Sequence, residues 1–102
     1  MISVRFTEQQ NQITALSVKG HAGSAEHGKD LVCAAVSGIV FGLCNALDQL
    51  AGVQTIEIGS NRIEIKIDVP DEKTELILRT GIVQLKTVSE TNQKFIKITE
   101  VQ

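Results

Sequence analysis

A histidine and a cysteine in the stretch GHAGSAEHGKDLVCAAVSG are the residues of this 102-residue chain best suited to chemistry. Cys33 follows His21 by twelve positions and falls near the start of a predicted helix. The unsatisfied N–H groups and the dipole at a helix start favour a thiolate over a thiol. A nearby imidazole can take the thiol proton and later return it to a leaving group. The pair therefore indicates a cysteine protease or an acyl-transfer enzyme.

Each residue around this pair also has a simpler interpretation. A lone cysteine is most often a small buried hydrophobe, and His27 in the same loop is an alternative base. Asp30 suits the N-cap of the helix, and it is also close enough in sequence to orient a histidine. Ser37 lies one helical turn after Cys33, where its hydroxyl can serve the site or bond back to a backbone carbonyl.

The loop with His21 is expected to join a hairpin to the helix. Alternating apolar residues and, after a polar turn near Gln9–Gln12, a second apolar run predict two antiparallel strands, marked by Ile2, Val4 and Phe6 and by Ile13, Leu16 and Val18. Gly20 ends the second strand, and Asp30 as N-cap would make Cys33 the third helical residue. Apolar residues cover most of the helix circumference as far as Gly52, which predicts a central, buried helix.

Three further elements are predicted after this helix. Residues 53–58 and 63–69 form a second hairpin around Gly59, and Phe95 begins a last strand. Pro70 and Asp71 start a second helix that Gly81 interrupts, with a shared stripe of Leu76, Ile77, Thr80, Val83, Gln84 and Val88. The order ββαββαβ predicts one α+β domain over residues 1–102, a largely antiparallel sheet with two helices packed on one face.

Charge and aromatic content bear on possible partners. The net charge is −2, and the three aromatic residues are all phenylalanine, so direct binding of nucleic acid is disfavoured. No apolar run approaches the roughly 18 residues that span a membrane, and the first residues do not resemble a signal peptide. A cytoplasmic protein without a membrane partner is therefore expected.

The two cysteines do not indicate a disulfide or a metal site. Cys33 and Cys44 lie eleven positions apart on the predicted helix, about 16 Å along its axis, so they cannot pair with each other. Two cysteines also do not suit a structural zinc site. The chemistry proposed for His21 and Cys33 needs no metal or organic cofactor. The glycine-bearing loop precedes a helix, as phosphate loops do, but GHAGSAEHG fits neither common phosphate-loop pattern.

The segment GHAGSAEHGKDLVCAAVSG closely resembles the signature of the ribosomal-processing cysteine proteases, called Prp, of Firmicutes and related bacteria. The resemblance covers essentially the whole chain and implies that Cys33 is the nucleophile and His21 the base. Gly20, Asp30 and Ser37 occupy the remaining signature positions. It further implies a homodimer that removes the N-terminal extension of large-subunit ribosomal protein twenty-seven, a basic protein. The histidine-bearing loop is then expected to order around the substrate.

Two functions of other classes stay open beside proteolysis. A non-catalytic ribosome-assembly module would bind a basic ribosomal-protein peptide without cutting it. A thiol-based redox or acyl-carrier enzyme would oxidise or acylate Cys33, although the chain has no CxxC pair to resolve an oxidised thiol.

Overall fold

The chain forms a five-stranded sheet with two helices, in a computed structural model that describes residues 1–20 and 27–102, with the backbone alone for 27–30. The elements in chain order are β1 (Ile2–Gln9), β2 (Gln12–Lys19), α1 (His27–Ala51), β3 (Ile56–Ile58), β4 (Arg62–Lys66), α2 (Glu72–Glu90) and β5 (Ile96–Val101). The predicted order ββαββαβ is confirmed.

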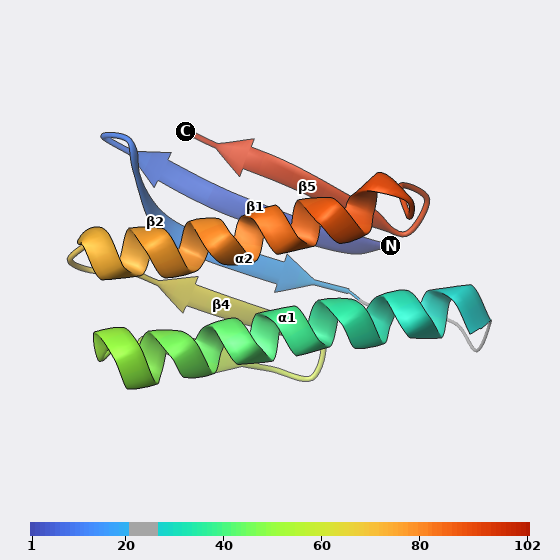
Figure 1. The fold of residues 1–102 in the computed structure, drawn as a ribbon, viewed down its shortest axis with the longest axis horizontal. Coiled ribbons are helices and arrows are strands. Elements are labelled where there is room, and N and C mark those ends of the chain that lie inside the picture. Colours follow the sequence, from blue (N-terminus) through green and yellow to red (C-terminus); the bar gives the residue numbers. More distant parts are fainter. Residues whose placement is uncertain (21–26) are drawn as a thin grey trace.

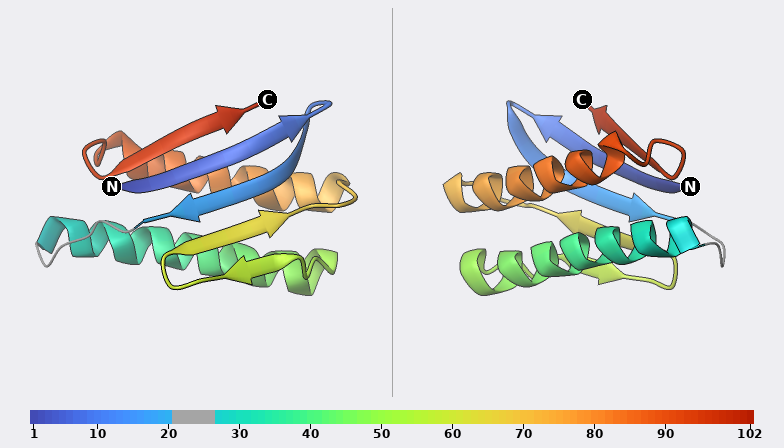
Figure 2. Two further views of the ribbon diagram at one scale, coloured as in Figure 1. Left: turned by 180° about the vertical axis from the view of Figure 1, so that it is seen from behind. Right: turned by 45° about the vertical axis from the view of Figure 1, so that its right-hand side comes forward.

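The sheet has the strand order β3-β4-β2-β1-β5. Neighbouring strands run antiparallel except β1 and β5, which pair in parallel with Ile2 opposite Ile96. Helices α1 and α2 lie side by side across one face of this sheet (Figure 1). The opposite face is seen in the left view of Figure 2, where no described element covers it. The predicted α+β architecture, with both helices on one face, is therefore confirmed.

The first hairpin forms as its alternation predicts. Residues Gln10 and Asn11 make its turn with positive φ angles of 54° and 64°, a conformation that tight hairpin turns require. All six apolar residues that marked the two strands are buried beneath the helices, and a register shift between Thr7 and Glu8 lets Ile13 share the inner face with Leu16. Gly20 ends β2, so the second strand delivers the chain to the segment that carries His21.

Helix α1 packs one side on the sheet and leaves its other side exposed. Val32, Val36, Val40 and Leu47 are buried, and Gly52 ends the helix with φ +67° while its N–H donates to the Asp48 carbonyl at 3.1 Å. The expectation of a central, buried helix is wrong for the outer side of α1. Leu31 and Leu50 are 72% and 64% exposed, because this two-layer fold has no described element over the outer side of α1.

The expectation about apolar runs was also wrong. The 21 residues Leu31–Ala51 have a mean hydropathy of 1.8 and are long and apolar enough, by length and composition, to cross a membrane. Asp48 is the one charged residue among them. Small and polar residues stand between the apolar ones, so the segment does not look like a continuous apolar run in the sequence. Core helices have the same properties, and the buried side of α1 supplies a large part of this core.

Helix α2 begins where the sequence predicts and turns a different side to the core. The Asp71 carboxylate accepts from the Thr74 N–H at 2.9 Å, and the Thr74 hydroxyl oxygen accepts from the Asp71 N–H. This reciprocal pair is a capping box. The predicted stripe is wrong at Leu76, which is 71% exposed, and at Thr80, Val83 and Gln84, whereas Ile77 and Val88 are partly buried against the core. The buried residues are instead Thr74, Leu78, Gly81, Ile82 and Leu85. Both sets have helical spacing, so only the packing of α2 in the folded protein decided between them.

Gly81 and the second hairpin account for the remaining differences. A Cβ at Gly81 would lie 2.8 Å from Leu43 Cδ1, so glycine lets α1 and α2 approach each other closely. The expected interruption of the helix at Gly81 is not found, since α2 continues through it. Strands β3 and β4 are shorter than predicted, and Val69, expected in the core, is 79% exposed in the turn before α2.

Candidate active site

Helix α1 begins earlier than the sequence suggests, which changes the setting of Cys33. The first helical residue is His27, so Asp30 lies inside the first turn and is not the N-cap. Cys33 is then the seventh helical residue, in the second turn. Small and polar residues before Asp30 continue the helix, and the preference of aspartate for N-caps gave the wrong boundary.

The place of Cys33 in the second turn weakens the argument that the start of the helix stabilises its thiolate. The dipole acts mainly within the first turn, and the backbone N–H of a residue in the second turn bonds to a carbonyl four residues earlier. The Cys33 N–H therefore belongs to the helix and is not available as an oxyanion donor. The backbone at the helix start therefore does not support Cys33 as a nucleophile.

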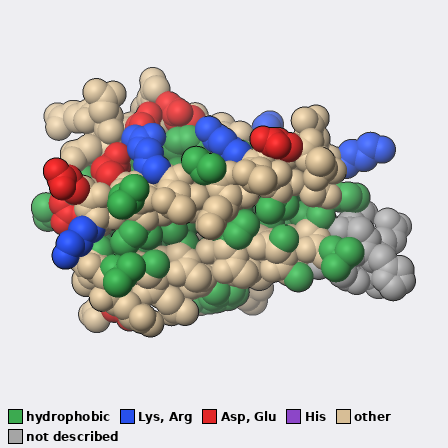
Figure 3. Space-filling model, in the orientation of Figure 1, with side chains coloured by type: hydrophobic (Ala, Val, Ile, Leu, Met, Phe, Trp, Pro, Cys, Tyr) green, Lys and Arg blue, Asp and Glu red, His purple; other side chains and the backbone are tan. Residues whose placement is uncertain are grey.

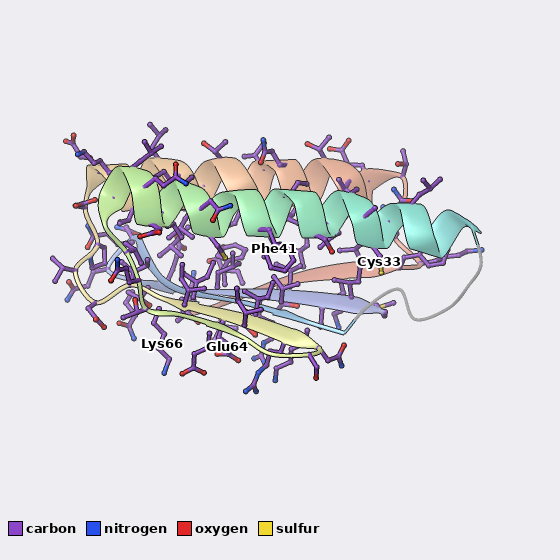
Figure 4. The ribbon with its side chains drawn as sticks, turned by 90° about the horizontal axis from the view of Figure 1, so that it is seen from below. Cys33, Phe41, Glu64 and Lys66 are labelled. Atoms are coloured by element: carbon purple, nitrogen blue, oxygen red, sulfur yellow. The ribbon has the colours of Figure 1, made fainter. Side chains whose placement is uncertain are left out.

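Cys33 stands on a face of α1 that borders a cavity. Its side chain is half-buried, and Ser37 and Phe41 follow it at one-turn intervals on the same face. Figure 4 shows Cys33 and Phe41 projecting from α1 on the side of the sheet. A cavity of about 180 Å³ is lined by Gly20, Cys33, Ser37, Phe41, buried apolar residues and the β3–β4 turn from Gly59 to Ile63.

Gly20 forms the opposite wall of this cavity at the end of β2. Its φ is +78°, and a Cβ built there would meet the Met1 carbonyl oxygen at 2.7 Å. Its N–H donates to the Asn61 carbonyl at 3.0 Å, which ties the end of β2 to the β3–β4 turn. Glycine is required here, because any side chain would be strained by both the dihedral angle and the contact. The next residue in the chain is His21.

The structure brings three of the five predicted site residues to one cavity, Gly20, Cys33 and Ser37. His21 lies outside the described residues. Asp30 and the alternative base His27 are described by their helical backbone only. Contact between His21 and Cys33, and the roles of all five residues, therefore stay predictions.

Cys44 occupies a different environment on the same helix. It is 6% exposed, within the core between α1 and the sheet. Burial raises the pKa of the Cys44 thiol, so this group remains protonated. The interpretation of Cys44 as apolar filler is confirmed.

Several residues of the cavity were missed in the sequence. Phe41 follows Cys33 and Ser37 at the same four-residue interval, a signal that was available in the sequence. Ser60, Asn61 and Arg62 carried no such signal. They reach the cavity only because β4 pairs with β2, which sets the β3–β4 turn beside Gly20.

Comparison with known proteins identifies the family. The family model for cysteine protease Prp matches residues 1–97. The chain is 34% identical over 95 residues to a ribosomal processing cysteine protease Prp of Bacillus subtilis, covering 85% of each chain.

Two solved structures of an essential ribosomal processing protease Prp from Staphylococcus aureus share the fold. One, in complex with a covalently linked product peptide, has a TM-score of 0.88 at 30% identity. The other, in complex with a substrate peptide, has a TM-score of 0.84 at 28% identity. Each comparison covers 98% of this chain and 99% of the other. The chain therefore belongs to the Prp family and is a cysteine protease.

Proposed function

We propose that this protease removes the N-terminal extension of large-subunit ribosomal protein twenty-seven, with Cys33 as nucleophile and His21 as base. The observation that carries the proposal is the half-buried Cys33 on the rim of the Gly20–Ser37–Phe41 cavity, inside the stretch that resembles the family signature. The curated relative from Bacillus subtilis is named as a ribosomal processing protease. Processing of a ribosomal protein also makes the cytoplasm the proposed location.

The proposed reaction is acyl transfer through a thioester. His21 takes the Cys33 proton, and the thiolate sulfur attacks the scissile carbonyl carbon. His21 then gives the proton to the leaving amine as the C–N bond breaks. Water, deprotonated by His21, attacks the thioester, which releases the carboxylic acid and restores the thiol. The relative with a covalently linked product peptide supports the covalent step.

Donors to the tetrahedral oxyanion are proposed on the cavity wall. The Cys33 N–H is used within α1, whereas the Ser37 hydroxyl and the side chains of Ser60 and Asn61 belong to residues that line the same cavity. One oxyanion donor typically contributes about 3 kcal/mol to the stabilisation of the transition state. Asp30 is proposed to orient His21, and Gly20 to leave space for the peptide backbone.

A homodimer is part of the same proposal. The helical layer exposes apolar side chains that include Leu31, Leu50, Leu76 and Val83. Figure 3 shows apolar side chains along both helices, and a groove of about 560 Å³ lies between them. Exposed apolar surface of this kind favours association between protein chains. Light scattering coupled to size exclusion should give twice the monomer mass of 11.0 kDa.

The test of catalysis uses a peptide that spans the junction between the extension and the mature protein. Mass spectrometry should detect two product peptides with the unchanged protein and with Cys44→Ala, the matched control on the same helix. Cys33→Ala and Cys33→Ser should give none, and His21→Ala should be strongly impaired. Binding of the peptide without cleavage by the unchanged protein would favour the assembly-module alternative, and cleavage by Cys33→Ala would rule out the proposed nucleophile.

A further inference from the structure

The sheet face opposite the helices is an uncovered surface built from alternate residues of all five strands. In the described residues nothing packs over it, as the left view of Figure 2 and the edge-on view in Figure 4 show. The side chains of Glu64 and Lys66, labelled in Figure 4, point away from both helices. This open face lies on the other side of the sheet from the buried residues Val4, Leu16 and Ile65.

Basic side chains predominate on the open face. Strand register and alternation place on it five basic residues, Arg5, Lys19, Arg62, Lys66 and Lys97, and two acidic ones, Glu57 and Glu64. The five basic residues are all exposed. Five positive and two negative groups give this face a net charge of +3, although the whole chain carries −2. The remainder of the chain therefore carries −5, and the fold separates the two signs.

The register arranges these cations in rows. Lys97 of β5 lies opposite Ser3, Ser3 opposite Lys19, and Lys19 opposite Arg62, so one row crosses four strands. Strands are spaced about 4.8 Å apart, which makes this row about 14 Å wide. Arg5 stands two residues further along β1, and Lys66 four residues further along β4.

Most of these charges form no ion pair with another described residue. Among the ion pairs recorded between described residues, one lies on the open face, Arg62 Nε to Glu64 Oε1 at 3.6 Å. The other two join Arg79 to Glu8 and to Glu75 at the edge of the helical layer. Hydroxyl groups of Ser3 and Thr99 stand between the cations and add hydrogen-bond donors, whereas the Ser17 hydroxyl donates to Glu64 Oε1 at 3.4 Å.

We propose that the open face binds the phosphate backbone of RNA. Exposed cations interleaved with hydroxyls are the groups that contact phosphates, and a broad flat face can engage several phosphates at once. The face carries no aromatic side chain, so it has no platform for stacked bases, and binding is independent of base sequence. The net charge of the chain, which argued against nucleic acid, averages over two surfaces of opposite sign.

RNA fits this face better than a lipid surface does. Membrane-binding surfaces insert large apolar side chains between headgroups. The exposed large apolar residues among the described ones lie elsewhere. Met1 precedes β1, Val69 lies in the turn before α2, and Ile58 ends β3 on the face of the sheet that the helices cover. The others belong to the helices: Leu31, Phe41, Leu50, Leu76 and Val83.

The experiment measures binding of a short fluorescein-labelled RNA duplex by anisotropy at about 50 mM and about 200 mM salt. The test variant is Arg5→Gln/Lys66→Gln/Lys97→Gln, which leaves the cavity residue Arg62 in place. The matched control is Lys73→Gln/Lys86→Gln/Lys94→Gln, with the same net charge but with changes outside the open face. Circular dichroism and peptide cleavage by both variants establish that the fold and the active site are intact.

The unchanged protein should bind the duplex and a duplex of scrambled sequence equally well. The open-face variant should bind at least about tenfold more weakly, and the slope of log K against log salt should fall by about 2 to 3 for the three lost charges. The control variant should stay within about twofold of the unchanged protein. The proposal is overturned if the unchanged protein does not bind RNA at low salt, or if both variants weaken binding equally. It is also overturned if phosphatidylserine vesicles retain the protein through these three residues while RNA does not.

Discussion

Cys33 and Cys44 show how position on one helix determines the chemistry of a side chain. Cys33 is half-buried at the rim of a cavity, and Cys44 is 6% exposed inside the core. Burial raises the pKa of the Cys44 thiol, because the thiolate would lose its solvation there. A nucleophile must be reachable by its substrate, so of the two cysteines Cys33, at the rim of the cavity, is the candidate.

Alkylation should distinguish these two cysteines. With limiting iodoacetamide at about pH 6, Cys33 should be modified while Cys44 stays largely unmodified in the folded protein. Peptide mass spectrometry after the reaction measures the modified fraction at each site. In urea both thiols should react, which serves as the control for access. Equal, slow modification of both in the folded protein would show that Cys33 is an ordinary structural thiol.

At the scale of elements, the ends of helices and the contacts between them explain the differences from expectation. Helix α2 begins directly after Pro70 and Asp71, the predicted start, and Asp71 is its N-cap: Asp71 and Thr74 bond to each other's backbone N–H groups. Helix α1 begins three residues before the residue taken as its cap, Asp30. Gly81 lies where α2 contacts Leu43 of α1, so the closest approach of the helices depends on one missing side chain.

Loss of the α2 cap should destabilise the protein. Asp71→Ala leaves the Thr74 N–H without its side-chain acceptor and should lower the free energy of unfolding by about 1 kcal/mol. Urea denaturation followed by circular dichroism measures the change. Asp68→Ala is the matched control, since Asp68 is an exposed aspartate three residues earlier with no recorded side-chain bond to the described residues. Equal effects of the two substitutions would contradict the capping role.

Gly81→Ala should destabilise the protein even though alanine is the better helix former. The gain in helix propensity is about 1 kcal/mol, whereas overpacking against the buried Leu43 costs about 1–3 kcal/mol. Urea denaturation should therefore show a net loss of up to about 2 kcal/mol. In a Leu43→Ala background the obstacle is absent, and the same substitution should become stabilising. Stabilisation by Gly81→Ala alone would contradict the close contact.

At the scale of the whole molecule, a polar cluster joins both layers at the end opposite the cavity. Arg79 of α2 bonds to Glu8 of β1 and donates to the Asn11 carbonyl in the hairpin turn at 3.2 Å. Glu75, which pairs with Arg79, also accepts the backbone N–H of Ile13 at 2.6 Å. These bonds attach α2 to the β1–β2 hairpin and complement the apolar contacts between the layers.

This cluster should make stability depend on pH. The hydrogen bond from Arg79 holds the pKa of the Glu8 carboxyl below its ordinary value of 4.5. Its contribution to stability is therefore fully present above about 4.5 and is lost as the pH falls through the lower, folded-state pKa. Arg79→Met should lower the urea midpoint at pH 7, and this difference from the unchanged protein should shrink in acid below 4.5. Lys73→Met is the control on the same helix, and a difference that persists unchanged in acid would contradict the assignment.

Much of this protein could be predicted from local sequence patterns. Period-two alternation predicted β1, an apolar run after a polar turn predicted β2, and Pro70 with Asp71 predicted the start of α2, because neighbours in the chain decide these features. The signature stretch predicted the family, which is confirmed. The start of α1 and the lengths of β3 and β4 were missed, since element ends depend on contacts that local patterns do not contain.

The sequence by itself determined the order of elements, the family and the identity of the candidate nucleophile. The tertiary structure alone decided which stripe of α2 is buried, which residues of the β3–β4 turn line the cavity with Cys33, and that all five cations of the strands share one face. These features arise from strand pairing and helix packing between residues far apart in the chain. The local patterns allow either stripe of α2 to be buried, and they allow the strand cations to lie on one face of the sheet or on both. Only the folded arrangement distinguishes these possibilities.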